Sequence, residues 1–226
     1  MLHLLLNTLF PKVCSACSKT LNTKEKVLCV SCRHQLPLAS FHNTGASTML
    51  DFFYGRIKVE NATALIAFQK KGITQTILHN LKYKGQENIS AFFGKWLGAE
   101  LVEIPEYKDI DIVIPVPLHR KRKQKRGYNQ VTGFGTEIAS SLQIDYREDV
   151  LLKKTRTRSQ VFKSRYKRSE QSTVFQLANI SELENKHILV VDDILTTGAT
   201  LENCALELLK VKGVKISFAV IAITLS

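Results

Sequence analysis

The sequence lacks an apolar run long enough to cross a membrane, and it contains no internal repeat and no low-complexity tract. The opening stretch "MLHLLLNTLF" is apolar for only ten residues, has no cationic leader and runs directly into "PKVCSAC", which is not a signal peptidase site. We expect this stretch to form a short amphipathic helix that packs on the body of the protein. We also expect the protein to be cytoplasmic and not to insert into a membrane.

Acidic residues are scarce, with 20 Asp and Glu against 32 Lys and Arg, so the formal net charge is +12. The chain of 226 residues is 44% hydrophobic and its mean hydropathy is −0.06, values that are typical of a globular protein. This length can bury one core, in a single domain or in a domain with a small appendage. In so basic a chain, two adjacent carboxylates need an explanation.

Cysteine is also rare, but four of the five cysteines fall in the first 32 residues. They form two Cys-x2-Cys pairs separated by eleven residues, and each pair turns tightly enough to direct two sulfurs at one point. The residues between the pairs are too few to form a core, so a bound metal would supply the folding energy. The pattern predicts a small zinc ribbon whose ligands are Cys14, Cys17, Cys29 and Cys32.

Two disulfides would use the same four cysteines, but the lack of a secretory signal favours zinc. His34 could replace one ligand, although four thiolates already complete a tetrahedral shell. Cys204 has no partner in this pattern. It lies on the apolar face of an expected helix and is predicted to be a core residue.

Beyond the cysteines, residues 37–55 look like a linker that passes into an apolar arm, after which strand-like and helix-like segments alternate. Continuous Val and Ile runs separated by helices predict an α/β fold with a parallel sheet covered on both faces. Ligands bind such sheets at the carboxyl ends of strands, so functional residues should follow "IVIP" and "ILVV". Expected strands cover residues 62–68, 109–117, 186–193 and 214–223, and expected helices cover residues 73–85, 87–104, 129–143 and 199–213.

The two adjacent carboxylates occur in "HILVVDDILTTGATL", residues 187–201, where Asp192 and Asp193 follow an apolar strand. Successive strand residues point to opposite sides, so this pair is unsuited to act as a mutually repelling acid and base. A carboxylate has two oxygens that can accept hydrogen bonds from neighbouring hydroxyls, such as the cis-diol of a ribose. We therefore interpret the pair as sugar-hydroxyl acceptors.

The turn that follows the two aspartates has the composition of an anion site. It offers backbone N–H groups around Gly198 and Ala199, hydroxyls from Thr196, Thr197 and Thr200, and the positive end of the next helix. Diol acceptors and phosphate donors a few residues apart together indicate a ribose 5-phosphate. The simpler alternative is that one aspartate caps the helix and the turn only connects two elements.

Two runs of the sequence are strongly basic, residues 118–126 and 153–168, and together they hold 14 of the 32 Lys and Arg with no acidic residue. Such runs are often only solvated surface. With Tyr128, Phe162 and Tyr166 interleaved, they could also bind single-stranded DNA through phosphate contacts and base stacking. The same aromatic residues could equally anchor the core.

The segment "VVDDILTTGATL" resembles the signature loop of type I phosphoribosyltransferases, which bind phosphoribosyl pyrophosphate (PRPP). Two leading Cys-x2-Cys pairs, "LKYKG", "VIPVPLHRKR", "RGYNQ" and "TRTRSQ" make the chain similar to the ComF family of competence-related proteins. The resemblance implies an N-terminal helix and zinc module at residues 1–45 and a type I phosphoribosyltransferase-like domain at residues 60–226. These motifs span nearly the whole chain.

The resemblance also implies ligands and partners. Asp192 and Asp193 would meet the ribose hydroxyls, residues 196–200 would wrap the 5-phosphate, and Mg²⁺ would accompany PRPP. The segment that binds the pyrophosphate would consist of Val116, Pro117, Leu118, His119 and Arg120. Partners would include a competence helicase or other DNA-uptake proteins.

Six further residues could contact phosphates or DNA: Lys82, Tyr83, Arg122, Arg126, Asn129 and Gln130. Lys82 and Tyr83 could instead only end a helix, and Asn129 could cap one. Two functions therefore stay open. One is a Mg²⁺-dependent phosphoribosyltransferase, in which a nitrogenous acceptor attacks C1 of PRPP. The other is a non-catalytic, PRPP- or nucleotide-responsive single-stranded DNA-binding competence factor, since no segment of the sequence is recognisable as a hood that selects a base.

Overall fold

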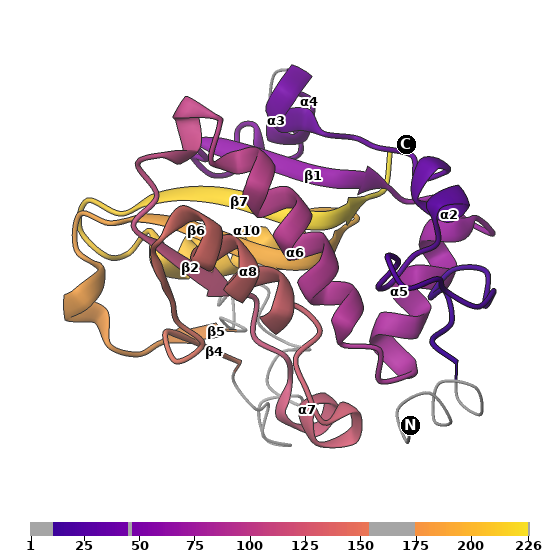
Figure 1. The fold of residues 1–226 in the computed structure, drawn as a ribbon. Coiled ribbons are helices and arrows are strands. Elements are labelled where there is room, and N and C mark those ends of the chain that lie inside the picture. The colour runs from indigo at the N-terminus through magenta and orange to yellow at the C-terminus, as the bar shows by residue number, and fades with distance from the viewer. Residues whose placement is uncertain (1–10, 45–46, 154–174, 226) are drawn as a thin grey trace.

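Five parallel strands form the central sheet of the computed structural model, which describes residues 11–44, 47–153 and 175–225. The strand order is β1-β7-β6-β2-β3, and every neighbouring pair is parallel. Figure 1 shows these strands side by side, with β6 between β7 and β2. Their bounds are β1 Asn61–Ala67, β2 Ile112–Pro115, β3 Asp145–Tyr146, β6 His187–Leu195 and β7 Lys215–Ile223.

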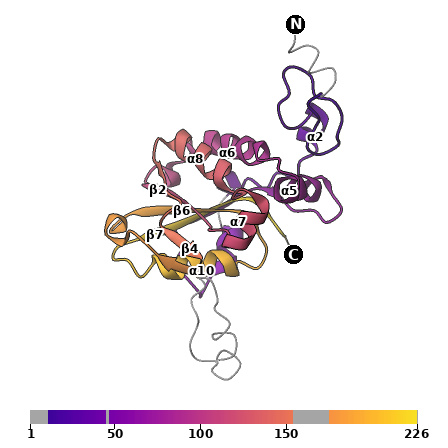
Figure 2. The same ribbon diagram turned by 90° about the horizontal axis from the view of Figure 1, so that it is seen from below.

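Helices cover both faces of this sheet, which confirms the predicted fold class. One face carries α5 (Ile73–Tyr83), α6 (Asn88–Leu101) and α8 (Thr132–Leu142), and the other carries α10 (Ala199–Leu208). Figure 2 shows these two layers with the sheet between them. Because both faces are dry, β6 and β7 are apolar at successive positions instead of alternating with polar residues.

The side chains of β6 alternate between two separate cores. Leu189 and Val191 pack in the core on the side of α5, α6 and α8, whereas Ile188 and Val190 pack in the core on the side of α10. The alternation continues to Asp193, which meets Lys82 on the α5 side of the sheet. It is interrupted at the next residue, because Ile194 packs against the α5-side core and Leu195 lies in the α10-side core.

The segment expected to be a linker is instead packed into the fold. Residues 41–44 and 47–53 form α3 (Phe41–Thr44), α4 (Ser47–Leu50) and the 3-10 helix η1 (Asp51–Phe53), with Phe41, Met49 and Phe53 buried in the α10-side core. His42 bonds Thr63 Oγ1 through Nδ1 and Glu100 Oε2 through Nε2, both at 2.8 Å. The predicted apolar arm is thus present, but the residues expected to be a linker are held in the core by their buried apolar side chains.

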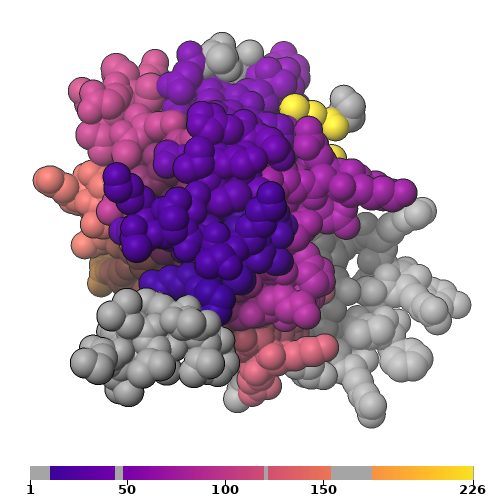
Figure 3. Space-filling model, turned by 45° about the vertical axis from the view of Figure 1, so that its right-hand side comes forward, coloured from indigo at the N-terminus to yellow at the C-terminus, as the bar shows by residue number. Residues whose placement is uncertain are grey.

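The cysteine-containing segment contributes to the same core as α5 and α6. Residues 12–36, with the short helix α2 (Val30–His34), bury Leu21, Val27 and Leu28 in the cluster that contains Leu81 and Phe93. Asn80 Nδ2 donates to Ser15 O at 2.8 Å, and the Arg33 guanidinium lies 4.7 Å from the Trp96 ring centroid. Figure 3 shows this indigo segment packed against the magenta part of the chain.

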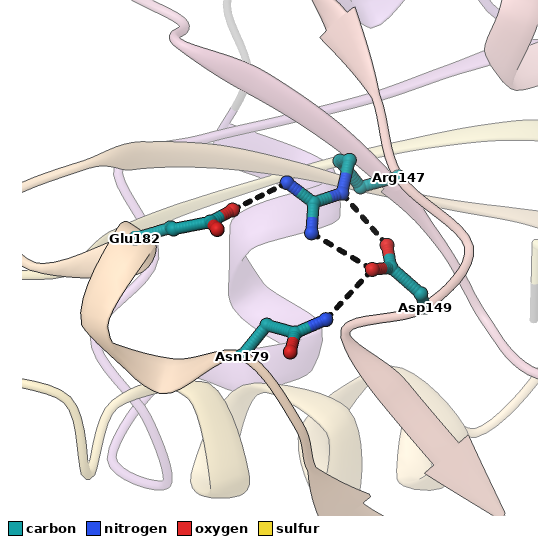
Figure 4. Close-up of polar contacts among 4 residues, drawn as sticks. All are labelled: Arg147, Asp149, Asn179 and Glu182. Atoms are coloured by element: carbon teal, nitrogen blue, oxygen red, sulfur yellow. Dashed lines mark hydrogen bonds and ion pairs between the residues drawn. The ribbon is translucent and has the colours of Figure 1, made fainter.

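An antiparallel pair, β4 (Leu151–Lys153) and β5 (Phe175–Leu177), was not predicted. Beside it, Arg147 holds both carboxylate oxygens of Asp149 at 2.7 and 2.8 Å and Glu182 at 2.5 Å, and Asn179 donates to Asp149 at 2.7 Å (Figure 4). The bidentate Arg147 contact lowers the pKa of Asp149 to about 2. These contacts hold the end of β3 against η3 (Ile180–Leu183).

Two of the predicted features lie outside the described residues: the helix at residues 1–10, and residues 154–168 of the second basic run with Phe162 and Tyr166. The first basic run forms α7 (Arg120–Arg126), and a 3-10 helix η2 (Pro105–Tyr107) precedes β2. Within the part of the chain that the structure describes, no helix is both long and apolar enough to cross a membrane.

Candidate functional site

The two predicted functional strand ends, those of β2 and β6, are neighbours. Pro115 pairs with Val191, and Val116 N donates to Val191 O at 2.9 Å, so the chain after β2 stays beside β6 for one residue more. The expected pyrophosphate segment therefore begins directly next to Asp192. Because β2 and β6 are parallel, their carboxyl ends lie at the same edge of the sheet.

The acidic pair, Asp192 and Asp193, lies within β6 and not after it, because the strand continues to Leu195. Asp193 continues the side of Val191 and meets Lys82 of α5, with Nζ 2.9 Å from Oδ1. Asp193 is only 3% exposed, and its Oδ2 is buried without a hydrogen-bond partner among the described residues. A buried carboxylate oxygen without a partner is uncommon, and a ligand, an ion or a water would satisfy it.

Asp192 occupies the opposite face, which confirms that the two side chains diverge. Its Oδ1 accepts a hydrogen bond from the Asp193 N–H at 2.8 Å, and the side chain is buried. Burial, followed by the negative charge of Asp193, raises the pKa of Asp192 to about 8. The charge of one aspartate therefore still affects the protonation of the other, although the two side chains point to opposite faces of the sheet.

The turn between β6 and α10, residues 196–198, presents an open helix terminus. Gly198 has φ +82°, a left-handed conformation that favours glycine, and α10 begins at the next residue. No side chain within the described residues caps α10, so the alternative in which an aspartate caps this helix is wrong. Thr196, Thr197, Ala199 and Thr200 are exposed, and the first N–H groups of a helix have no partner within it.

The expected pyrophosphate segment connects β2 to α7. Val116 is buried, whereas Pro117, Leu118 and His119 are partly exposed, and Arg120 is the first residue of α7. Asn129 is buried and donates from Nδ2 to Val116 O at 3.2 Å. The Asn129 side chain therefore holds this segment in place, and its Oδ1 also accepts a hydrogen bond from Val131 N at 3.5 Å, just before α8 begins at Thr132.

A basic pocket of about 360 Å³ lies beside the acidic pair and includes Lys82, the partner of Asp193. The Tyr83 ring is 68% exposed, and the Arg126 guanidinium lies 5.5 Å from its centroid. Arg126 also donates from Nη1 to Gln130 Oε1, which orients the guanidinium. The pocket is lined by Lys82, Tyr83, Gly85, Arg122, Lys125 and Arg126.

Tyr128 has a different role from Tyr83. Its hydroxyl donates to Leu81 O, and its ring packs against the core on the side of α5 and α6. Of the two readings open for this aromatic residue, the structure shows the core anchor. Tyr83 is the aromatic residue of this region whose ring is available to a ligand.

Arg56 is a residue that the sequence did not indicate. It follows η1, and its Nη1 lies 2.7 Å from Glu202 Oε2 in the first turn of α10. A Cβ built on Gly198 would lie 3.6 Å from Arg56 Nη2, so the guanidinium stands beside the turn. No local signal could have revealed this, because 146 residues separate Arg56 from Glu202.

The four N-terminal cysteines converge as predicted. Their sulfur atoms all lie within 4.8 Å of one another, and Cys17 Sγ is 3.8 Å from Cys29 Sγ. Two sulfurs of a tetrahedral zinc site with Zn–S bonds of about 2.3 Å lie about 3.8 Å apart, so the group has a suitable size. All five described cysteines are free thiols, and Cys204 is buried in the core as expected.

Comparison with known proteins gives a domain match and several relatives. The family described as phosphoribosyl transferase domain matches residues 132–225, from α8 through β7. The chain is 25% identical over 203 residues to the DNA utilization protein YhgH of Escherichia coli O157:H7, which covers 88% of this chain and 84% of that protein. It is 33% identical over 134 residues to the competence protein ComFC of Streptococcus pneumoniae, which covers 59% of this chain and 56% of that protein.

Among solved structures, adenine phosphoribosyltransferase from Leishmania tarentolae matches 60% of this chain and 71% of that chain, at 11% identity and a TM-score of 0.36. A score this low carries no argument about function. The matched domain and the named relatives are independent of this structural match. The chain is therefore similar to proteins of the ComF family, and its residues 132–225 match the phosphoribosyl transferase domain.

Proposed function

We propose that this protein binds PRPP with Mg²⁺ at the carboxyl ends of β2 and β6 and transfers its phosphoribosyl group to a nitrogenous acceptor. The observation that carries the proposal is the buried Asp193 carboxylate. One of its oxygens is paired with Lys82, and the other has no partner among the described residues. A buried anion with spare acceptor capacity is costly unless a ligand satisfies it. Sugar hydroxyls or a divalent cation have the required chemistry.

Each part of the site has a matching part of PRPP. The acidic pair accepts hydrogen bonds from the ribose hydroxyls, the turn at residues 196–200 holds the 5-phosphate, and residues 116–120 hold the pyrophosphate. Mg²⁺ would be held by Asp192 or Asp193 together with the ligand, and it would neutralise charge on the leaving pyrophosphate. The basic pocket beside Lys82 adds cations where that charge develops.

The charge of Asp193 should be essential for this binding. We expect Asp193→Asn to weaken Mg²⁺-dependent PRPP binding at least about tenfold, because the amide keeps the shape but loses the charge. Titration calorimetry measures the affinity, and Asp145→Asn, an exposed carboxylate on β3, is the matched control. Equal affinities of Asp193→Asn and the wild type would rule out this site.

A second experiment measures pyrophosphate release from PRPP and Mg²⁺ across a panel of nucleobases and amines. Release with one acceptor would show a transferase, and binding of PRPP without release would show a binding protein.

The raised pKa of Asp192 predicts how stability depends on pH. Between about pH 4 and about pH 8 the folded protein keeps a proton on Asp192 that the unfolded chain has lost. The free energy of unfolding of the ligand-free protein should therefore fall as pH rises through this window. Asp192→Asn removes the effect and should stabilise the protein by on the order of 2–4 kcal/mol at about pH 8.5, with little change at about pH 4.5. Urea unfolding at each pH measures this, and parallel profiles for the two proteins would contradict it.

We also propose that the four N-terminal cysteines bind one structural Zn²⁺. We further propose that residues 1–45 and 60–226 are two units of a cytoplasmic protein that pack together through the shared core on the side of α5 and α6. Free thiols within 4.8 Å of one another support the zinc proposal. Freshly purified protein should contain one zinc per chain by elemental analysis. Cys17→Ser should reduce the zinc content and lower the melting temperature, whereas the core variant Cys204→Ser should keep the zinc. Zinc-free wild-type protein would overturn the assignment.

A second function is favoured by the exposed ring of Tyr83 in the basic pocket. Relatives named for competence and DNA utilization support a role in DNA uptake, in which this pocket would contact single-stranded DNA. A DNA-uptake helicase or a similar protein would then be a partner. Stacking of a base on Tyr83 and phosphate contacts from Arg122 and Lys125 are the contacts this predicts.

Binding of an oligonucleotide should fall steeply as salt rises, and Arg122→Ala with Lys125→Ala should reduce the slope of log affinity against log salt by about 1.4. Tyr83→Leu should weaken binding by about 1–3 kcal/mol, whereas Tyr83→Phe should not. Fluorescence anisotropy measures both effects. The double variant Lys212→Ala with Lys215→Ala, near the amino end of β7, is the control for charge alone. A salt-independent affinity would exclude these phosphate contacts.

A further inference from the structure

We infer that Arg56 is a phosphate-binding residue of the turn between β6 and α10, and that it recognises the 5-phosphate end of the ligand. This inference rests on the proposed function and adds a residue to it. Arg56 lies outside every motif that indicated the site. It lies before β1 and directly follows residues 37–55, which looked like a linker in the sequence.

The fold fixes Arg56 in place through Phe53. Phe53 is fully buried, its ring lies 4.7 Å from that of Phe218 in β7, and Arg56 N donates to Phe53 O at 3.0 Å. The chain reverses at Gly55, whose φ is +71°. Phe53 is therefore fixed in the core, while the guanidinium of Arg56, three residues later, lies at the surface beside α10.

The guanidinium reaches the turn itself. A Cβ built on Gly198 would lie 3.1 Å from Phe53 Cε1 and 3.6 Å from Arg56 Nη2. Arg56 Nη2 is therefore close to the backbone whose N–H groups face the expected phosphate. Glycine at residue 198 keeps the space between the turn and the arginine open.

The charges around the helix terminus explain why an arginine is needed. Glu202 lies in the first turn of α10, and its carboxylate would repel a phosphate at the same terminus. Arg56 neutralises Glu202 through Nη1 at 2.7 Å, while Nη2 is directed to the turn. A guanidinium has five donors in a planar fork, so it can bond a carboxylate and a phosphate at once.

The ion pair can also rearrange when a ligand arrives. The side chain of Arg56 is 40% exposed and that of Glu202 is 23% exposed, so water screens their attraction. A phosphate dianion offers Arg56 a stronger acceptor than a single carboxylate does. Glu202 then acts as a competitor for the arginine, which gives the two residues opposite effects on phosphate affinity.

The test uses the full-length protein and two probes, ribose 5-phosphate and inorganic pyrophosphate with Mg²⁺. Arg56→Ala should weaken ribose 5-phosphate binding about tenfold or more, since a charge-assisted hydrogen bond is lost. Arg56→Lys should recover part of the loss, and Glu202→Gln should tighten binding about two- to fivefold because it frees the arginine. Pyrophosphate affinity should not change in any of these variants. Lys58→Ala removes an exposed charge two residues away and should bind as the wild type does.

Three outcomes would overturn the inference, and they are distinguishable. If the wild type binds ribose 5-phosphate and Arg56→Ala binds it equally well, Arg56 is no ligand contact, while the proposed site stands. If Arg56→Ala and Glu202→Gln both weaken binding and both lower the melting temperature, the pair is only a structural ion pair. If the wild type binds neither ribose 5-phosphate nor PRPP, the proposed function fails and this inference fails with it.

Discussion

The site depends on the burial of β6 on both of its faces. Because β6 lies between β2 and β7 and helices cover both sides, its side chains alternate between two dry cores. When the strand reaches Asp192 and Asp193, the same alternation sends one carboxylate into each side. The lack of water then makes each charge costly, so one carboxylate keeps its proton up to about pH 8 and the other is paired with Lys82. An exposed Asp-Asp pair in a loop would have neither property.

Some of the chain's many cations lie close enough to Asp192 and Asp193 to stabilise their negative charge. Lys82 meets Asp193 directly, and the charge of Lys153 lowers the pKa of Asp192 in opposition to its burial. Among the described residues, the other cations of the basic pocket, Arg122, Lys125 and Arg126, form no ion pair with an acidic side chain, and they surround an opening of about 360 Å³. The acids are therefore suited to the hydroxyl and metal contacts of a ligand, while the surrounding cations are suited to its phosphates.

The sequence was sufficient to predict elements that depend on local pattern. The Val and Ile runs predicted β6 and β7, helical periodicity predicted α5, α6, α8 and α10, and Cys-x2-Cys spacing predicted the convergence of four thiols. Contacts between distant segments left no such local signal. The burial of Phe53 and the position of Arg56 depend on partners more than a hundred residues away. Tyr83 and Tyr128 are both aromatic residues beside charges, and only the hydrogen bond from Tyr128 to Leu81 O distinguishes the core anchor from the exposed ring.

The last turn of α5 connects the separate motifs into one structure. Asn80 holds the cysteine segment through Ser15, Leu81 accepts the hydroxyl of Tyr128, and Lys82 pairs with Asp193. Three successive residues thus contact the cysteine-containing segment, the "RGYNQ" segment and the acidic pair. The side chains of Asn80 and Lys82 point in different directions around the helix axis. Leu81 makes its contact through a backbone carbonyl of the last turn, where carbonyl groups have no partner within the helix. This arrangement gives a physical reason for "LKYKG" to occur with the other motifs, since a displacement of α5 would move all three contacts together.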